Sequence, residues 1–242
     1  MIDYKTFENK IICCFQKYDI CHSADIINNF YIFTNYLLSE NEKYNLTSIA
    51  DLDEIIIKHY IDSVIMLKYI KIPENAKIVD IGTGAGFPAL PLYIMRNDLQ
   101  ITFLDSANKK INFVKNAAEK INGNPKNLIF YHGRAEECGK DPKIRETYDM
   151  AVSRALAKLS VLCEFAAPLI SPGGFFISYK GKNAESEIND AQNALKSLDL
   201  KIAETIKFDL ENENRTLIKI QKTNATSPRY PRKFSEMIKR PL

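Results

Sequence analysis

The segment spanning residues 77–90 constrains the fold more than any other part of the chain. It reads KIVDIGTGAGFPAL, in which a β-branched run precedes three glycines at alternate positions. The β-branched run predicts a strand buried on both faces, and Gly82, Gly84 and Gly86 allow a sharp backbone turn because they lack a Cβ atom. Pro88 suits the first turn of a helix, where no amide donor is needed. A strand, a glycine loop and a helix start in this order form a cradle for the polar part of a ligand.

The chain after residue 76 has the pattern of an α/β sheet, because short apolar runs alternate with amphipathic segments. Helices are expected at Lys109–Ile121 and Glu185–Leu198, which carry apolar residues on one face. Only Glu211–Asn214 separate the last two strands, so these should pair as an antiparallel hairpin at the sheet edge. The prediction is a Rossmann-like, seven-stranded, mostly parallel sheet with an antiparallel edge strand and helices on both faces. The expected strands are 77–81, 101–105, 128–131, 148–152, 174–179, 201–208 and 215–221.

Residues 3–70 are predicted to be helical, since apolar residues repeat there at helical spacing. Ser23 and Asp51 are the expected N-caps of the second and third helices. The third helix should run from Asp51 to about Tyr69, and the polar segment 39–48 should be a loop. We therefore expect an amino-terminal helical extension (1–72), a ligand-binding catalytic domain (73–222) and a carboxy-terminal tail (223–242).

The net charge of the chain is only +3, but the segment from Lys222 to Leu242 holds six basic residues and one acidic residue. The five cysteines form no Cys-x-x-Cys pair, which argues against a disulfide framework and a zinc site and favours a reducing cytoplasm. No apolar run reaches the roughly 18 residues of a membrane span, and the start lacks the core of a signal peptide. We expect a cytoplasmic monomer with no membrane segment and no metal.

Two acidic residues indicate which cofactor the glycine loop holds. Asp105 ends the second strand, nineteen residues after Gly86, where Rossmann-like folds place an acid for ribose hydroxyls. Phe87 occupies the place of the third glycine in the Gly-x-Gly-x-x-Gly loop of NAD sites, and its bulk disfavours a dinucleotide. Asp80, two residues before the loop, can offer a carboxylate to a cationic amine. The two acids together favour S-adenosylmethionine, which has ribose hydroxyls and an ammonium but no pyrophosphate.

Several further motifs point to one enzyme family. They are VDIGTGAGFP at 79–88, FLDS at 103–106, GRAE at 133–136, VSRA at 152–155, YNLT at 44–47, HYIDS at 59–63 and YPRK at 230–233. As a set, they resemble the bacterial small-subunit (16S) ribosomal RNA guanine-N7 methyltransferase family, also called glucose-inhibited division protein B. Two places depart from its usual pattern. Ala89 stands where the family has glycine, and Phe234-Ser-Glu236 stand where it has Gly-Thr-Pro.

The resemblance implies a class I methyltransferase that uses S-adenosylmethionine and acts on the ribosomal RNA or on the small ribosomal particle. It implies cofactor contacts at Gly82, Phe87, Ala135, Glu136 and Arg154. The physical argument adds Asp80, Gly84, Gly86 and Asp105 to these.

Because guanine N7 already presents a lone pair, no base needs to remove a proton before the methyl transfer. Catalysis should therefore depend mainly on positioning the two reactants. Arg154 follows the fourth strand at the sheet rim, where its guanidinium can stack on a base or donate hydrogen bonds to it. We expect Arg154 and His59 to position the reactants, with Asn45, Thr47 and Asp62 beside His59 as a second wall over the cofactor. Cys163 lies in a predicted helix and is expected in the core.

The tail alternates aromatic and basic residues at 230–234, which suits phosphate contacts and stacking on unpaired bases. The expected RNA-binding residues are Asn45, Thr47, Lys180, Arg229, Arg232 and Lys233. A target base would have to leave its stack to reach the methyl group. Two alternatives remain on the residues alone: a methyltransferase for a small metabolite, and a non-catalytic nucleotide-sensing adaptor.

Overall fold

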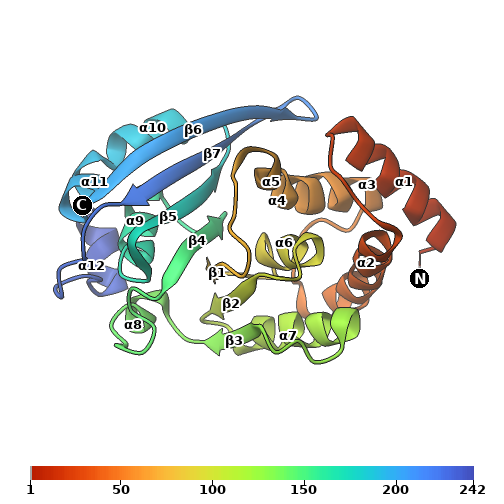
Figure 1. Cartoon of the computed structure of the whole chain (residues 1–242), viewed down its shortest axis with the longest axis horizontal. Coiled ribbons are helices and arrows are strands. Elements are labelled where there is room, and N and C mark those ends of the chain that lie inside the picture. The colour runs from red at the N-terminus through yellow and green to blue at the C-terminus, as the bar shows by residue number, and fades with distance from the viewer. Residues whose placement is uncertain (1) are drawn as a thin grey trace.

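The structure, a computed structural model, describes residues 2–242. Its centre is one seven-stranded sheet in the order β3-β2-β1-β4-β5-β7-β6 (Figure 1). The strands are β1 (Lys77–Ile81), β2 (Gln100–Asp105), β3 (Leu128–His132), β4 (Tyr148–Arg154), β5 (Ile170–Lys180), β6 (Leu200–Leu210) and β7 (Glu213–Lys222). All seven predicted strands are confirmed. β5 begins four residues earlier than expected, because Ile170 pairs with Tyr148 across a bulge.

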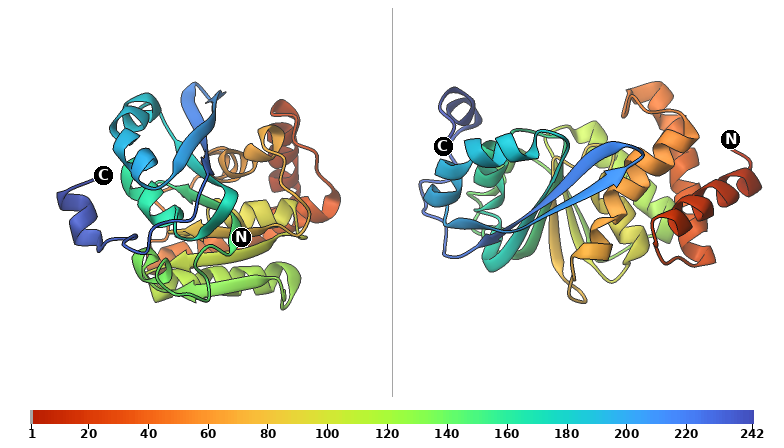
Figure 2. Two further views of the ribbon diagram at one scale, coloured as in Figure 1. Left: turned by 60° about the vertical axis from the view of Figure 1, so that its left-hand side comes forward. Right: turned by 90° about the horizontal axis from the view of Figure 1, so that it is seen from above.

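The predicted hairpin is also confirmed. β7 runs antiparallel to both β5 and β6, so β6 is the edge strand and the other neighbouring pairs are parallel. The hairpin is long and reaches across the molecule toward the amino-terminal helices (Figures 1 and 2). At its tip, Glu211 pairs with Lys17 at 2.5 Å.

Helices cover both faces of the sheet. One face packs against α6 (Ala89–Met95) and α7 (Asn108–Asn122), and the other against α9 (Leu159–Ala166), α10 (Ala184–Asp190) and α11 (Gln192–Ser197). The alternation along β1 explains this division, since Ile78 belongs to the first apolar cluster and its neighbour Val79 to the second. The short α8 (Ala135–Cys138) follows β3.

The amino-terminal helices share the first of these apolar cores. α1 (Tyr4–Lys17) and α2 (Ala24–Tyr44) bury Phe7, Phe30 and Phe33 in the same cluster as strand residues of the sheet. Ser23 and Asp51 cap their helices as predicted. Among residues 2–242, no helix is both long and apolar enough to traverse a bilayer.

Three local expectations were wrong. The polar segment 39–48 is a loop only from Asn45 onward, because α2 continues to Tyr44 and ends where Asn45 adopts the left-handed conformation. The expected third helix is not one α-helix. It consists of α3 (Leu52–Glu54), a π-helix (Ile55–Ile61), α4 (Asp62–Val64) and α5 (Met66–Tyr69). The helix expected at 185–198 is interrupted at Ala191, which is fully buried between α10 and α11.

Candidate active site

The glycine loop after β1 adopts the backbone that the sequence predicts. Gly82, Gly84 and Gly86 have φ values of +73°, +59° and +91°, which residues with a side chain rarely adopt. A Cβ atom on Gly82 would lie 2.6 Å from the Leu156 side chain, and one on Gly86 would lie 3.1 Å from Leu90. The loop is joined to β2, because the amide of Gly82 donates to the carbonyl of Leu104 at 2.8 Å. α6 starts at the next residue after Pro88.

A cavity of about 450 Å³, the first cavity, lies over this loop at the carboxyl ends of β1, β2 and β4. This volume is within the roughly 300–1,000 Å³ of small-molecule sites. Most of the predicted contacts line it: Thr47, His59, Gly82, Gly84, Phe87, Asp105, Ala135, Glu136 and Arg154.

Asp105 is fixed at the wall of the first cavity by backbone donors. Its Oδ2 accepts from the amide of Gly84 at 3.0 Å, and its Oδ1 accepts from the amide of Ala107 at 2.9 Å. Each carboxylate oxygen keeps a further acceptor site, so the group can also accept from a ligand hydroxyl. The geometry fits the ribose diol of S-adenosylmethionine.

Asp80 and Gly86 do not line the first cavity. The Asp80 carboxyl is buried beneath the loop, where its Oδ2 accepts from the Thr83 hydroxyl at 2.6 Å. Its Oδ1 has no hydrogen-bond partner within the described chain, and burial raises the pKa of Asp80 to about 7. In this arrangement the carboxyl supports the loop through Thr83, and its contact with an ammonium stays a prediction.

Arg154, His59 and Phe87 form a stacked cluster in the wall of the first cavity. The His59 ring lies 4.3 Å from the Phe87 ring at 18°, and the Arg154 guanidinium carbon lies 5.1 Å from that ring. The guanidinium donates to Asp62 at 2.8 Å, to the Lys58 carbonyl at 2.9 Å and to His59 Nδ1 at 3.2 Å. All these partners come from the π-helix or from the residue after it, and π-helical turns are frequent at functional sites.

The hydrogen bonds assign the proton of His59. Arginine can only donate, so Nδ1 must accept and the proton resides on Nε2, which donates to the Thr47 hydroxyl at 2.9 Å. Burial and then the charge of Arg154 lower the pKa of His59 to about 3. The imidazole is therefore neutral at physiological pH, which suits a positioning group and not a proton donor.

A second cavity, of about 650 Å³, adjoins the first. The two share His59, Arg154 and residues 155–157, so Arg154 stands in the wall between them. The second cavity carries more basic than acidic side chains. Its other lining residues include Lys58, Asp62, Lys158, Lys180, Glu187, Phe208 and Arg215.

The predicted RNA-binding residues are not equivalent in the structure. Lys180 lines the second cavity, but its ammonium is paired with Glu187 at 2.7 Å and donates to the Ala157 carbonyl at 2.8 Å. Arg232 makes an ion pair of 2.6 Å with Glu164, which is almost fully buried, so we assign Arg232 to anchoring the tail. The side chains of Asn45, Arg229 and Lys233 are exposed.

Two further aromatic residues line the first cavity: Phe165 was not predicted, and Phe234 was expected only in the tail segment that would stack on RNA bases. Phe165 comes from α9, and Phe234 is the first residue of α12 (Phe234–Lys239) in the tail. Only the packing of α9 and the path of the tail bring these two rings to the cavity. Cys163 is buried in α9 as expected, and burial raises the pKa of its thiol to about 12.

Within residues 2–242, no three His, Cys, Asp or Glu side chains gather as a metal site would require.

Solved structures of similar shape show the fold. A mutant of the 16S rRNA (adenine(1408)-N(1))-methyltransferase from Catenulisporales acidiphilia matches with a TM-score of 0.51 at 15% identity, covering 64% of this chain and 88% of that one. A chain of the complex between the Haloferax volcanii Trm112 methyltransferase activator and the putative methyltransferase matches with a TM-score of 0.55 at 15% identity, covering 70% and 92%. These similarities establish the Rossmann-like methyltransferase fold.

Sequence relatives identify the family. The protein named ribosomal RNA small subunit methyltransferase G in Desulfitobacterium hafniense is 39% identical over 229 residues, or 94% of each chain. Its namesake in Clostridium kluyveri is 41% identical over 215 residues, covering 89% of this chain and 90% of that one. A family profile described as rRNA small subunit methyltransferase G matches residues 26–218. The chain belongs to the rRNA small subunit methyltransferase G family.

Proposed function

We propose that this protein transfers the methyl group of S-adenosylmethionine to N7 of a guanine in small-subunit (16S) ribosomal RNA. The observation that carries the proposal is the pair of adjoining cavities that share the Arg154 wall, in a chain of this family. A methyl donor in one cavity and an acceptor base in the other would meet at that wall. The site of action would be the cytoplasm, where this RNA is made.

The residues of the first cavity fit the cofactor. Asp105 offers its carboxylate to the ribose, Gly82 and Gly84 let the ligand approach the backbone, and Ala135 and Glu136 extend the wall beyond β2 and β3. When bound, S-adenosylmethionine supplies a sulfonium methyl group, and its transfer to the N7 lone pair breaks the S–C bond, leaves that electron pair on sulfur and removes no proton.

The second cavity suits a nucleotide that has left its stack. Its basic side chains favour a phosphate, and Phe208 offers an aromatic face to a base. The ion pair with Asp62 balances the charge of Arg154. The remaining N–H groups of its guanidinium can donate hydrogen bonds to the guanine that accepts the methyl group. His59 is neutral, so it adds no repulsion as the guanine gains positive charge. These features make positioning the main contribution of the protein.

The test uses cofactor labelled in the methyl group and small ribosomal subunits from a strain that lacks this methylation. We expect label in the RNA, at a position mapped by reverse-transcription stops after reductive cleavage at N7-methylguanine. Naked RNA and intact subunits are compared in parallel to identify the true substrate. The absence of label from both would overturn the proposal, and label in a small metabolite alone would favour a metabolite methyltransferase.

A further inference from the structure

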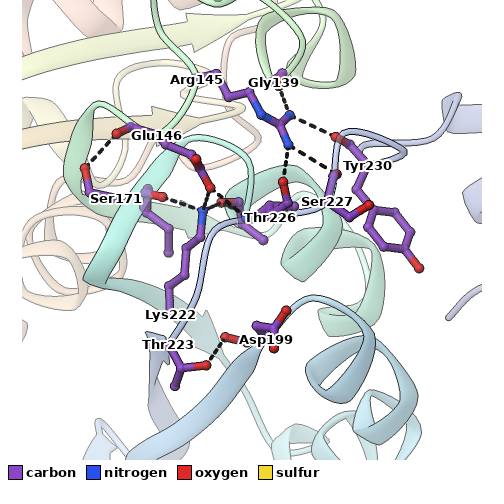
Figure 3. Close-up of polar contacts among 12 residues, drawn as sticks. Gly139, Arg145, Glu146, Ser171, Asp199, Lys222, Thr223, Thr226, Ser227 and Tyr230 are labelled. Carbon is purple, nitrogen blue, oxygen red and sulfur yellow. Dashed lines mark hydrogen bonds and ion pairs between the residues drawn. The ribbon is translucent and has the colours of Figure 1, made fainter.

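The carboxy-terminal tail is held against the sheet by a partly buried framework of polar contacts (Figure 3). Lys222 ends β7 and is fully buried, where its ammonium pairs with Glu146 and donates to the carbonyls of Ala167 at 2.6 Å and Ile170 at 2.8 Å. The Glu146 carboxylate also accepts from the amide of Thr226 at 2.7 Å. The point where the tail leaves the sheet is therefore fixed.

The next part of the tail is held by one arginine. Arg145 donates to the carbonyls of Thr226, Ser227 and Tyr230 in the tail, at 2.7, 3.2 and 2.9 Å, and to Gly139 at 2.6 Å (Figure 3). Tyr230 is buried beside this guanidinium. These contacts use backbone carbonyls, so they hold the path of the chain whatever side chains it carries.

A second anchor follows at Arg232. Its guanidinium binds both carboxylate oxygens of Glu164, and its backbone amide donates to Glu164 Oε1 at 2.8 Å. Glu164 lies on α9, one residue before Phe165. The anchor thus places Phe234 beside Phe165, with their ring centres 6.0 Å apart and an angle of 25° between the rings.

Both rings line the first cavity, although Phe234 is 40% exposed. The framework therefore presents a partly exposed aromatic ring at the first cavity. Because much of the Phe234 ring stays in contact with water, its position contributes little apolar burial to the stability of the fold. A flat heteroaromatic group packed against these rings from the cavity side would extend their contacts, because aromatic side chains stack readily on bases.

We propose that Phe234 is a cofactor contact supplied by the tail, and that it forms with Phe165 the aromatic surface against which the adenine ring of S-adenosylmethionine packs. The exposed cations Arg229 and Lys233 belong to the same anchored segment. RNA bound by these cations would keep Phe234 in place, so RNA and cofactor bind with positive and reciprocal coupling. This inference rests on the proposed function.

The contact is tested by calorimetry with S-adenosylhomocysteine and the full-length protein, without RNA. We expect Phe234→Ala to weaken binding about 5- to 100-fold, the usual effect of losing one aromatic stacking partner, and Phe234→Tyr to restore most of it. Ile238→Ala is the matched control, because Ile238 is an exposed apolar residue of the same helix that does not line either cavity. It should bind like the wild type.

Equal affinities of wild type and Phe234→Ala, with unchanged thermal melting, would overturn the contact. The coupling is tested separately, by filter binding of a 16S RNA fragment with and without S-adenosylhomocysteine. We expect tighter RNA binding with the ligand in the wild type and a smaller effect in Phe234→Ala. A wild-type RNA affinity indifferent to the ligand would overturn the coupling. Failure of methyl transfer would refute the proposed function alone, since the calorimetry requires neither RNA nor turnover.

Discussion

At the scale of single residues, Arg154 matters most because it belongs to both cavities. Its guanidinium contacts Asp62, the Lys58 carbonyl and His59 while it lies over Phe87. A planar group with several fixed donors can hold these acceptors together, whereas an ammonium is a single point charge. Small displacements of this group would change the alignment of methyl donor and acceptor.

We expect Arg154→Ala to lower the rate of methylation about 100-fold, because misplacing reactants by about 1 Å has an effect of this size. Arg154→Lys retains the charge but not the geometry, so its rate should fall between the two. The rates are measured at saturating cofactor on undermodified subunits. Arg96→Ala is the control, since Arg96 pairs with Asp98 away from both cavities. An Arg154→Ala rate close to wild type would exclude the positioning role.

Two buried groups near the loop have pKa values that are shifted in opposite directions. Burial, followed by the charge of Arg154, lowers the pKa of His59 from 6.5 to about 3, and burial raises the pKa of Asp80 from 3.8 to about 7. Between about pH 4 and 6.5, the unfolded chain holds a proton at His59 that the folded chain lacks, and the folded chain holds one at Asp80. The His59 contribution to stability therefore rises with pH, the Asp80 contribution falls, and each slope is at most about 1.4 kcal/mol per pH unit.

Substituting either residue should remove its own contribution to the pH dependence of stability. Relative to wild type, we expect His59→Gln to gain stability as the pH falls from about 6.5 to 4.5, and Asp80→Asn to lose it over the same interval. Urea unfolding at a series of pH values measures this, and differences from wild type cancel the titration of all other groups. Parallel curves for the three proteins would mean that neither group is shifted as described.

At the scale of elements, the glycine loop and the π-helix build the site together. The loop supplies left-handed backbone under the first cavity, and the π-helix brings the Lys58 carbonyl and the His59 ring to Arg154. α2 contributes by its length, because it continues to Tyr44 before Asn45 turns the chain. Thr47 then reaches His59. The contacts of Arg154 with Lys58 and His59 join segments that are about a hundred residues apart in sequence.

We expect Gly82→Ala to destabilise the fold by about 1–2 kcal/mol and to weaken binding of S-adenosylhomocysteine, since the new methyl group meets Leu156 in the cavity wall. Gly123→Ala is a matched control. Gly123 has φ +71°, close to the +73° of Gly82, but a Cβ atom there meets nothing within 4 Å and lies outside both cavities. Melting should show a loss of stability in both variants, and calorimetry a loss of affinity only in Gly82→Ala. Equal affinities would show that the loop does not touch the ligand.

At the scale of the whole molecule, the two ends of the chain lie on opposite sides of the molecule (Figures 1 and 2). The amino-terminal helices share an apolar core with the sheet, through contacts such as Phe33 with Phe87 at 5.6 Å between ring centres. We propose that this extension folds together with the sheet. The tail is attached through the polar anchors and also through the buried side chains of Tyr230 and Met237, while its cations Arg229 and Lys233 are exposed.

The tail cations should differ in their effect on RNA binding. We expect Lys233→Ala and Arg229→Ala each to reduce the slope of log affinity against log salt by about one, as loss of a phosphate contact does. Arg232→Ala should leave that slope unchanged and destabilise the fold by about 3 kcal/mol, because it leaves Glu164 buried without its partner. Filter binding at roughly 50 to 200 mM salt and urea unfolding measure the two effects. A reduced slope in Arg232→Ala would return this residue to the RNA contacts.

Much of the fold was predictable from the sequence, because its signals are local. Seven strands, the closing hairpin and the caps at Ser23 and Asp51 follow from the spacing of apolar residues and from turn and cap chemistry within a few residues. The glycine loop follows in the same way, since three left-handed residues within five positions strongly favour glycine, which has no Cβ atom. The π-helix could not be predicted, because its apolar pattern is that of an ordinary helix.

The sequence by itself determined that a Rossmann-like sheet holds a cofactor at the loop of residues 77–90, with Asp105 and Arg154 at the neighbouring strand ends. Tertiary structure alone decided which charged and aromatic side chains reach the cavities. It buried Asp80 beneath the loop, paired Arg232 with Glu164, and brought Phe234 to Phe165. The physical reason is that the state of a charge or a ring depends on its neighbours in space, and these neighbours come from segments that no sequence spacing connects.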